Sequence, residues 1–283
     1  MPYVRIVVLT SLAMIAFASN SLLCRIALKD TGIDPASFTT IRLVSGAVIL
    51  WLIVTMRRNT NGGKGNWLSA LALFIYAAGF SFAYVNLSAS TGALLLFGAV
   101  QVTMIGLGLW SGERLQSTQL VGLLLALAGL VGLLSPGLSA PPLSGSLLML
   151  IAGVAWGVYS LRGKGAGDPM KVTAGNFLRA VPFAAVLSLL MQDEVSLDIA
   201  GFWYAILSGA VASGIGYAIW YAALPMLRVS TAATVQLSVP VLTALGGIAF
   251  LGESVTLRLV LASLAILGGI GLVILKKKEG VAR

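Results

Sequence analysis

The chain has 283 residues, of which 58% are hydrophobic and 10% are charged, with a formal net charge of +9. Because a soluble domain carries about 25% charged residues, this composition and a mean hydropathy of +0.99 exclude a soluble protein. The long apolar runs lack the alternation of barrel strands, so they predict membrane-spanning helices. The Lys and Arg residues fall in short loops between these runs, which is a signal of membrane topology and argues against a surface for nucleic acid.

Ten apolar runs follow one another along the chain, each of about the twenty residues that a helix needs to cross a bilayer. They are expected near Tyr3–Leu28, Pro35–Met56, Trp67–Leu87, Thr91–Trp110, Thr118–Ser135, Leu143–Leu161, Val172–Met191, Ala200–Tyr221, Ser230–Leu251 and Thr256–Leu275. The predicted fold class is an all-α integral membrane protein with ten transmembrane helices and no soluble domain. The first run resembles a signal peptide, but cleavage would remove a helix that the second half of the chain matches, so we expect the run to remain.

The cationic residues indicate how the ten spans are oriented. An even number of spans places both termini on one side, and most Lys and Arg residues fall on that side. They are Arg5, Arg57, Arg58, Lys64, Arg114, Arg162, Lys164, Lys171, Arg228, Lys276, Lys277, Lys278 and Arg283. Only Arg25, Lys29 and Arg258 fall on the opposite side. The positive-inside rule therefore predicts cytoplasmic termini and a place in the cytoplasmic (inner) membrane.

A repeated stretch indicates that the chain is a tandem duplication. The segment Thr91–Glu113 recurs as Thr231–Glu253, with Thr, Ala, Gly and Glu residues at matching positions. The second and seventh spans share a further pattern, an Asp-Pro pair followed by one arginine. These residues are Asp34, Pro35 and Arg42 in the first half and Asp168, Pro169 and Arg179 in the second. Since five is an odd number of spans, the two halves (1–139 and 140–283) are predicted to be inverted repeats, the architecture of secondary transporters.

Several short motifs of the second half, in this order and after such a duplication, resemble a known family. They are Tyr221-Ala222-Ala223-Leu224, Thr231-Ala232-Ala233, Pro240-Val241 and Leu251-Gly252-Glu253. The chain resembles the drug/metabolite transporter superfamily, EamA type, and within it is most similar to bacterial aromatic amino-acid exporters. The resemblance implies that the first four helices of each half surround a central cavity, with the fifth and tenth helices at the periphery.

Polar and aromatic residues concentrate in the inner spans and are candidates for lining such a cavity. They are Asn20, Tyr76, Phe80, Tyr84, Gln101, Trp156, Tyr159, Tyr217, Trp220, Tyr221 and Gln236. The four-residue spacing of the aromatic residues in the third span places them in one stripe, and the eighth span carries a matching stripe. Two interpretations stay open, because the rings are suited either to core packing or to a cavity for apolar side chains. The two amides are equally suited to binding a zwitterionic backbone or to joining two helices.

Arg42 and Arg179 are the charged residues that lie deepest in the spans. A central arginine costs about 2.5–3.5 kcal/mol on insertion scales, so its presence needs a reason. Each is close enough to a helix end to snorkel or to pair with backbone carbonyls, and the alternative is contact with a substrate carboxylate or gating, Arg42 from the outer side and Arg179 from the inner. Glu113 and Glu253 precede helices, where a carboxylate is favourable, and are interpreted as structural.

Together these features predict a secondary transporter that exports small metabolites, namely amino acids that include aromatic ones, by alternating access through a central cavity. No span interior contains Asp or Glu, which disfavours a proton-coupled exporter of lipophilic cations. The alternatives are a carrier for another neutral or anionic metabolite and a membrane sensor or scaffold that transports nothing. An enzyme is not expected, because the spans offer neither His nor paired acids. We expect no cofactor or metal, no nucleic-acid partner and no required oligomer, and a small-molecule substrate and the lipid bilayer as partners.

Overall fold

The computed structural model describes residues 2–57, 62–110, 116–137, 140–163, 166–227 and 235–276, and these residues contain helices and no strand. The α-helices are α1 (Pro2–Asp30), α2 (Pro35–Met56), α3 (Trp67–Tyr84), α4 (Ala89–Trp110), α5 (Ser117–Leu134), α6 (Leu143–Arg162), α7 (Pro169–Leu190), α8 (Ile199–Ile206), α9 (Gly216–Ala223), α11 (Ser238–Leu251) and α12 (Leu257–Lys276). Short 3-10 helices cover Gln192–Glu194 (η1) and Leu224–Met226 (η3), and a π-helical segment covers Leu207–Ile215 (η2).

Nine stretches of the described chain are long and apolar enough to cross a membrane, and α11 is a shorter apolar helix. The predicted all-helical membrane fold is thus confirmed, with the ninth span observed from Ser238 onward. The predicted start of that span and the end of Thr91–Glu113 lie outside the described residues, as do Arg58, Arg114, Lys164, Arg228 and the chain after Lys276. The third span ends at Tyr84, three residues earlier than expected, because α4 already begins at Ala89.

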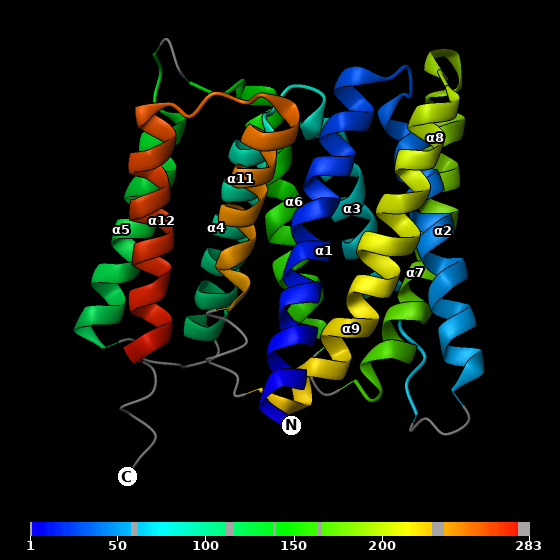
Figure 1. Cartoon of the computed structure of the whole chain (residues 1–283), viewed down its shortest axis with the longest axis horizontal. Helices are drawn as coiled ribbons and strands as arrows, with labels where there is room; N and C mark the ends of the chain where they lie inside the picture. The colour runs from blue at the N-terminus through cyan, green and yellow to red at the C-terminus, as the bar shows by residue number, and fades with distance from the viewer. Residues whose placement is uncertain are drawn as a thin grey trace.

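The helices form an upright bundle in which α1 begins and α12 ends at the same end (Figure 1). We call this the proximal end and the opposite one the distal end. Helices α3 and α4 pack against α6, and in the inverted half α9 and α11 pack against α1. Helix α2 packs against α7, α4 against α11 and α5 against α12, so these helices contact their counterparts from the other half. This arrangement matches the predicted inverted repeats.

Helices α5 and α12 stand side by side at one edge of the bundle, away from α2 and α7 (Figure 1). They approach closely because their interface carries small residues: a Cβ on Gly122 would collide with the carbonyl of Gly269, and one on Gly129 would lie 2.9 Å from the Cβ of Ala265. Small residues of this kind allow helices to pack tightly in lipid. The peripheral position implied for the fifth and tenth spans is therefore observed.

The two halves begin their second helices in the same way. Asp34 caps α2 by accepting hydrogen bonds from the amides of Ala36 and Ser37, and Asp168 caps α7 through the amides of Met170 and Lys171. In each helix a proline follows the cap, where its missing N–H costs nothing. The repeated Asp-Pro pair thus fixes where both helices start.

The eighth span is one apolar stretch whose hydrogen-bonding pattern changes in the middle, from α8 through η2 to α9. The sequence predicted a regular helix here, and the π-helical turns of η2 are a departure from it. Segment η2 packs directly on α2, where a Cβ on Gly209 would collide with the carbonyl of Arg42. π-helical turns are frequent at functional sites, and this one lies beside the deepest charge of the bundle.

Candidate functional site

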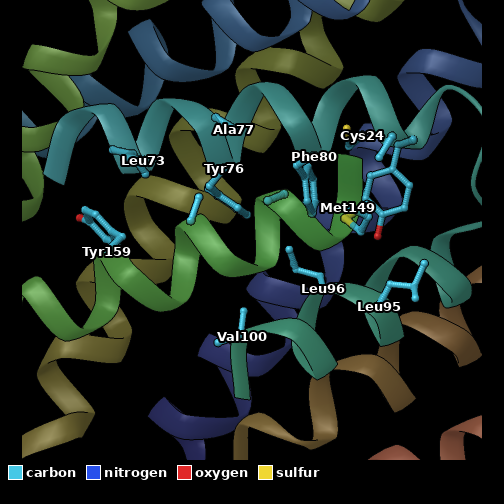
Figure 2. Close-up of a cluster of buried hydrophobic side chains, with 14 of the residues drawn as sticks. Cys24, Leu73, Tyr76, Ala77, Phe80, Leu95, Leu96, Val100, Met149 and Tyr159 are labelled. Carbon is cyan, nitrogen blue, oxygen red and sulfur yellow. The ribbon is translucent and has the colours of Figure 1, made fainter. Parts of the chain in front are cut away.

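Aromatic side chains from α1, α3, α6, α7 and α9 meet inside the bundle. We call this group the aromatic cluster; its members are Phe17, Tyr76, Phe80, Trp156, Tyr159, Phe177, Tyr217 and Tyr221. Trp156 joins the two predicted stripes, with ring centroids 4.7 Å from Tyr76 and 5.6 Å from Tyr217. Figure 2 shows Tyr76 and Phe80 reaching from α3 toward α6, the helix that carries Tyr159. The inverted repeat thus brings the two stripes together.

Burial differs between members of the aromatic cluster. Phe80 is 1% exposed and Tyr76, Tyr159 and Tyr217 are each 6% exposed, whereas Trp156 and Tyr221 are only half-buried. The hydroxyl of Tyr159 contacts the hydroxyl of Thr173 at 3.5 Å, and Thr173 donates to the hydroxyl of Tyr221 at 3.1 Å. The cluster therefore combines apolar ring faces with hydroxyl groups.

A chain of hydrogen bonds crosses the cluster at Tyr76. Its hydroxyl oxygen accepts from Nη2 of Arg42 at 3.0 Å and from Nδ2 of Asn20 at 3.4 Å. The hydroxyl of Ser208, in η2, donates to Oδ1 of Asn20 at 2.6 Å. Asn20 thus joins α1, α3 and the eighth span, which is the helix-joining role that the sequence left open for it.

Arg42 is a buried charge without a counterion in the described part of the chain. It is 2% exposed, its guanidinium carbon lies 4.8 Å and 5.3 Å from the ring centroids of Phe80 and Tyr76, and its Nη1 is buried with no hydrogen-bond partner. No described acidic residue forms an ion pair with it. A charge removed from water without a partner costs several kcal/mol, of which the ring faces recover about 2 kcal/mol for each contact. Snorkelling of the Arg42 side chain toward a helix end, which was one interpretation of this residue, is not observed.

Arg179 has a different environment. Its Nη1 donates to the carbonyl of Lys64 at 2.6 Å and to that of Gly175 at 2.9 Å, near the proximal end. The side chain is half-buried and its charge is stabilised by backbone dipoles. Pairing with carbonyls, expected as one alternative for both arginines, is therefore observed for Arg179 alone.

The remaining candidates lie apart from Arg42. Tyr84 packs edge-on against Phe80 at 4.7 Å and donates from its hydroxyl to the Ala89 carbonyl at 3.3 Å. Trp220 contacts Phe17 at 6.2 Å from a second apolar group that includes Met14 and Val239. Gln101 is buried on α4 and Gln236 is half-buried before α11; no hydrogen bond or ring contact recorded between described residues joins either to the aromatic cluster.

Sequence reasoning missed Ser208, Thr173, Phe17 and Phe177 as neighbours of this site. A serine, a threonine and two phenylalanines in apolar spans carry no pattern that separates them from ordinary packing residues. The π-helical turns that place Ser208 beside Asn20 have no signature in the sequence beyond nearby glycines. Among the described residues, no three His, Cys, Asp or Glu side chains are grouped so that they could hold a metal ion.

Matching contacts tie the two halves together at both ends of the bundle. At the distal end the Asp34 amide donates to the Ser196 carbonyl at 2.9 Å, and at the proximal end the Asp168 amide donates to the Gly62 carbonyl at 3.1 Å. The distal contact is reinforced by the Ser196 amide, which donates to Oδ2 of Asp34 at 3.0 Å. Each loop that follows α2 or α7 is thus fastened to the start of the other helix.

A further tie at the distal end involves Glu253. Its Oε1 accepts from the Ala89 amide at 2.6 Å, and its Oε2 accepts from the amide and hydroxyl of Ser90 at 3.2 Å and 3.1 Å. The expected structural role is observed, but the helix concerned is α4 of the other half instead of the following helix α12. Glu113, the matching residue, lies outside the described part of the chain.

A family model described as the EamA-like transporter family matches residues 4–135 and 143–275. The chain belongs to the EamA-like transporter family. It is 58% identical to an uncharacterized protein of Pseudomonas aeruginosa, over 100% of this chain and 99% of that protein. It is 30% identical to the threonine/homoserine exporter RhtA of Escherichia coli (strain K12), over 85% of this chain and 82% of the exporter.

A solved crystal structure that is 21% identical covers 94% of this chain and 99% of its own, with a TM-score of 0.65, and shows that the fold is shared. As a member of the EamA-like transporter family, the protein is a multi-pass membrane transporter, and the predicted resemblance to that family is confirmed. The closer likeness to aromatic amino-acid exporters is not shown by these comparisons and stays a prediction.

Proposed function

We propose that this EamA-like transporter exports amino acids and binds their carboxylate group at Arg42. The observation that carries the proposal is the buried Nη1 of Arg42, which has no partner while Nη2 is held by Tyr76. A carboxylate offers the acceptor that this nitrogen lacks, and a charge-assisted hydrogen bond of this kind is about twice as strong as a neutral one. The threonine/homoserine exporter relatives support an amino-acid substrate.

The aromatic cluster supplies the rest of the proposed site. Half-buried Trp156 stacks on Tyr159 and Tyr217, with centroids 5.2 Å and 5.6 Å away. Flat aromatic faces accept an apolar side chain, and they also attract an ammonium group through cation–π contact. We therefore extend the proposed substrates to aromatic amino acids, whose rings match these faces. Tyr84, Gln101, Trp220 and Gln236 are proposed to contact the substrate only during its passage, with Arg179 as a gating residue.

The proposed mechanism is alternating access. The halves 1–139 and 140–283 would rock about the Arg42 site, so that the distal contact of Asp34 with Ser196 and the proximal contact of Asp168 with Gly62 open in turn. We place the protein in the inner membrane with cytoplasmic termini, so the distal end faces outward. No chemical step, nucleic acid or second subunit is needed for this cycle.

The test is efflux from proteoliposomes loaded with labelled threonine, homoserine, phenylalanine or a lipophilic cation, with and without a pH gradient. Efflux of the amino acids is expected for the wild type and not for the cation. Tyr76→Phe removes the hydroxyl that holds both Arg42 and Asn20, and should slow efflux by about tenfold, the equivalent of one hydrogen bond to a charged group. Efflux of the cation alone, or equal rates for the wild type and Tyr76→Phe, would contradict the proposal.

A further inference from the structure

A pocket of about 400 Å³ opens at the distal end of the bundle, and none of the described residues that line it belongs to the Arg42 site. The end of α1, the start of α4 and the turn between α11 and α12 form most of its wall. Its polar lining includes Arg25, Lys29, Ser88, Thr91, Glu253 and Thr256. A volume of this size is typical of sites that bind small molecules.

The positive charges of this distal pocket are not neutralised by the described acidic residues. Glu253 uses both carboxylate oxygens on the first amides of α4 and on the Ser90 hydroxyl, so the helix dipole and these donors compensate its charge. Neither Arg25 nor Lys29 forms an ion pair with Glu253 or with another described acidic residue. The pocket therefore presents a net positive charge to a ligand.

Arg25 is held in place and still has hydrogen-bond donors to offer. Its Nη1 donates to the carbonyls of Tyr84 and Val85 at 2.7 Å and 2.9 Å, at the end of α3. Its Nε is buried and has no partner. Because a guanidinium has five N–H donors in a fixed plane, these bonds orient the group without exhausting it. Lys29 lies one turn further along α1 and is exposed.

The distal pocket lies directly beyond the aromatic residues that lead away from Arg42. Tyr76, Phe80 and Tyr84 contact one another in series, with centroid distances of 5.4 Å and 4.7 Å. The last of them is bonded to Ala89, whose amide in turn donates to Glu253 in the pocket wall. Two hydrogen bonds therefore connect the aromatic series to the wall of the pocket.

We propose that the distal pocket is a second binding site, which receives the carboxylate of the solute as it leaves the Arg42 site, with Arg25 as its principal ligand. The inference rests on the proposed function and adds an exit site to it. The group that the pocket is proposed to bind is a singly charged oxyanion. A lipid phosphate shares that chemistry, so the experiment must separate the two sources.

A single introduced thiol reports on the pocket. The one native cysteine, Cys24, is 0% exposed, so in Ser254→Cys the new side chain in the pocket wall is the accessible thiol. We expect a negatively charged thiosulfonate reagent to react about five- to tenfold faster than a positively charged one, because the pocket steers anions. L-threonine, L-phenylalanine and acetate should each slow that reaction, whereas glycerol should not.

Two further variants test the assignment of Arg25. Arg25→Gln in the Ser254→Cys background should abolish the preference for the anionic reagent and the protection by carboxylates. Arg258→Gln is the matched control, because Arg258 is another distal cation bonded to a carbonyl, that of Ser135, and does not line the pocket. If Arg25→Gln fails to fold, Lys29→Gln at the exposed neighbouring position should still lower the preference for the anionic reagent severalfold.

The outcomes separate the possibilities. The proposal would be overturned if both reagents reacted at equal rates and no carboxylate slowed the reaction. It would also be overturned if carboxylates still protected the thiol in the Arg25→Gln variant. Protection by phosphatidylglycerol vesicles but by no free carboxylate would make the pocket a lipid site and would also overturn it. If the wild type exports no amino acid while acetate protects in an Arg25-dependent way, the proposed function fails and the oxyanion site stands.

Discussion

Replacing Arg42 by methionine is expected to leave the unliganded protein at least as stable as the wild type while abolishing export. Methionine is unbranched and flexible, so it fills the space of the arginine stem within the aromatic cluster. A residue that serves only the fold would give the opposite result, because its removal would cost stability. The substitution therefore separates a binding role from a packing role.

The magnitude follows from the contacts of Arg42. The variant loses one hydrogen bond from a charged donor to Tyr76, worth about 1.5–3 kcal/mol, and two ring contacts, worth about 0.5–2 kcal/mol each. It also removes a charge that is 2% exposed and has no counterion among the described residues, which relieves a penalty of several kcal/mol. Since the opposing sums are of similar size, we expect a change in the free energy of unfolding between about zero and 2 kcal/mol of stabilisation.

The effect of Arg42→Met on substrate binding is larger than its effect on stability, and it is a loss of affinity. Loss of a buried charged partner costs about 2–5 kcal/mol of binding, which is at least about thirtyfold in affinity. Thermal unfolding of the purified protein with and without threonine measures both quantities, because a ligand that binds only the folded state raises the midpoint. The wild type should be stabilised by threonine and Arg42→Met should not.

Arg179→Met is the matched control for this experiment. Arg179 donates to two backbone carbonyls and is only half-buried, so its loss should destabilise the protein by about 1–3 kcal/mol. The reasoning is refuted if Arg42→Met unfolds at a markedly lower temperature than the wild type and the correctly folded fraction still exports at the wild-type rate.

Two further changes probe the ends of the bundle. Glu253→Gln places an amide group against the N–H donors of Ala89 and Ser90, and chemical unfolding should show a loss of about 1–2 kcal/mol; an unchanged midpoint would mean that α4 needs no cap from the other half. Gly65→Ala forces a side chain onto a backbone with φ +68° and within 2.5 Å of the Asn176 side chain, so circular dichroism melting should show at least about 1 kcal/mol of destabilisation. Gly62→Ala, where a Cβ meets nothing within 4 Å, is its control, and equal losses in both variants would contradict the assignment.

The fold could be predicted from the sequence because its determinants are local and repeated. Apolar length marks each span, and the Asp-Pro pairs at Asp34 and Asp168 mark where two helices begin. The two aromatic stripes were predicted as well, since a four-residue spacing fixes one face of a helix. The two stripes meet through Trp156. This contact depends on how the two halves pack, and the spacing of residues within one helix does not predict it.

The roles of single polar residues could not be predicted in the same way. Glu253 can cap either the following helix or α4, depending on which helix start lies within its reach. The start of α4 lies far from Glu253 in the sequence, so the sequence does not show that the two are close. The difference between Arg42 and Arg179 was also hidden, because the two appear as counterparts in the repeat. Only the structure shows that a loop covers one of them and leaves the other with an unpaired nitrogen.

The spacing from the capping aspartates explains that difference. Arg42 lies eight residues after Asp34, whereas Arg179 lies eleven residues after Asp168, and the residue eight positions after Asp168 is Asn176. Oδ1 of Asn176 accepts from the Asn66 amide at 2.9 Å, so the proximal loop satisfies this position of the second half.

At the same register of the first half stands a cation whose Nη1 has no partner. Among the described residues, the inverted repeat therefore supplies matching ends and matching aromatic stripes but only one unpaired positive group at this depth. One fixed charge suits one carboxylate, whereas a dianion would bring a second negative charge into the bundle, and the described residues offer no second unpaired cation at this depth to balance it. This asymmetry is the physical reason to expect monocarboxylates, amino acids among them, ahead of more highly charged metabolites.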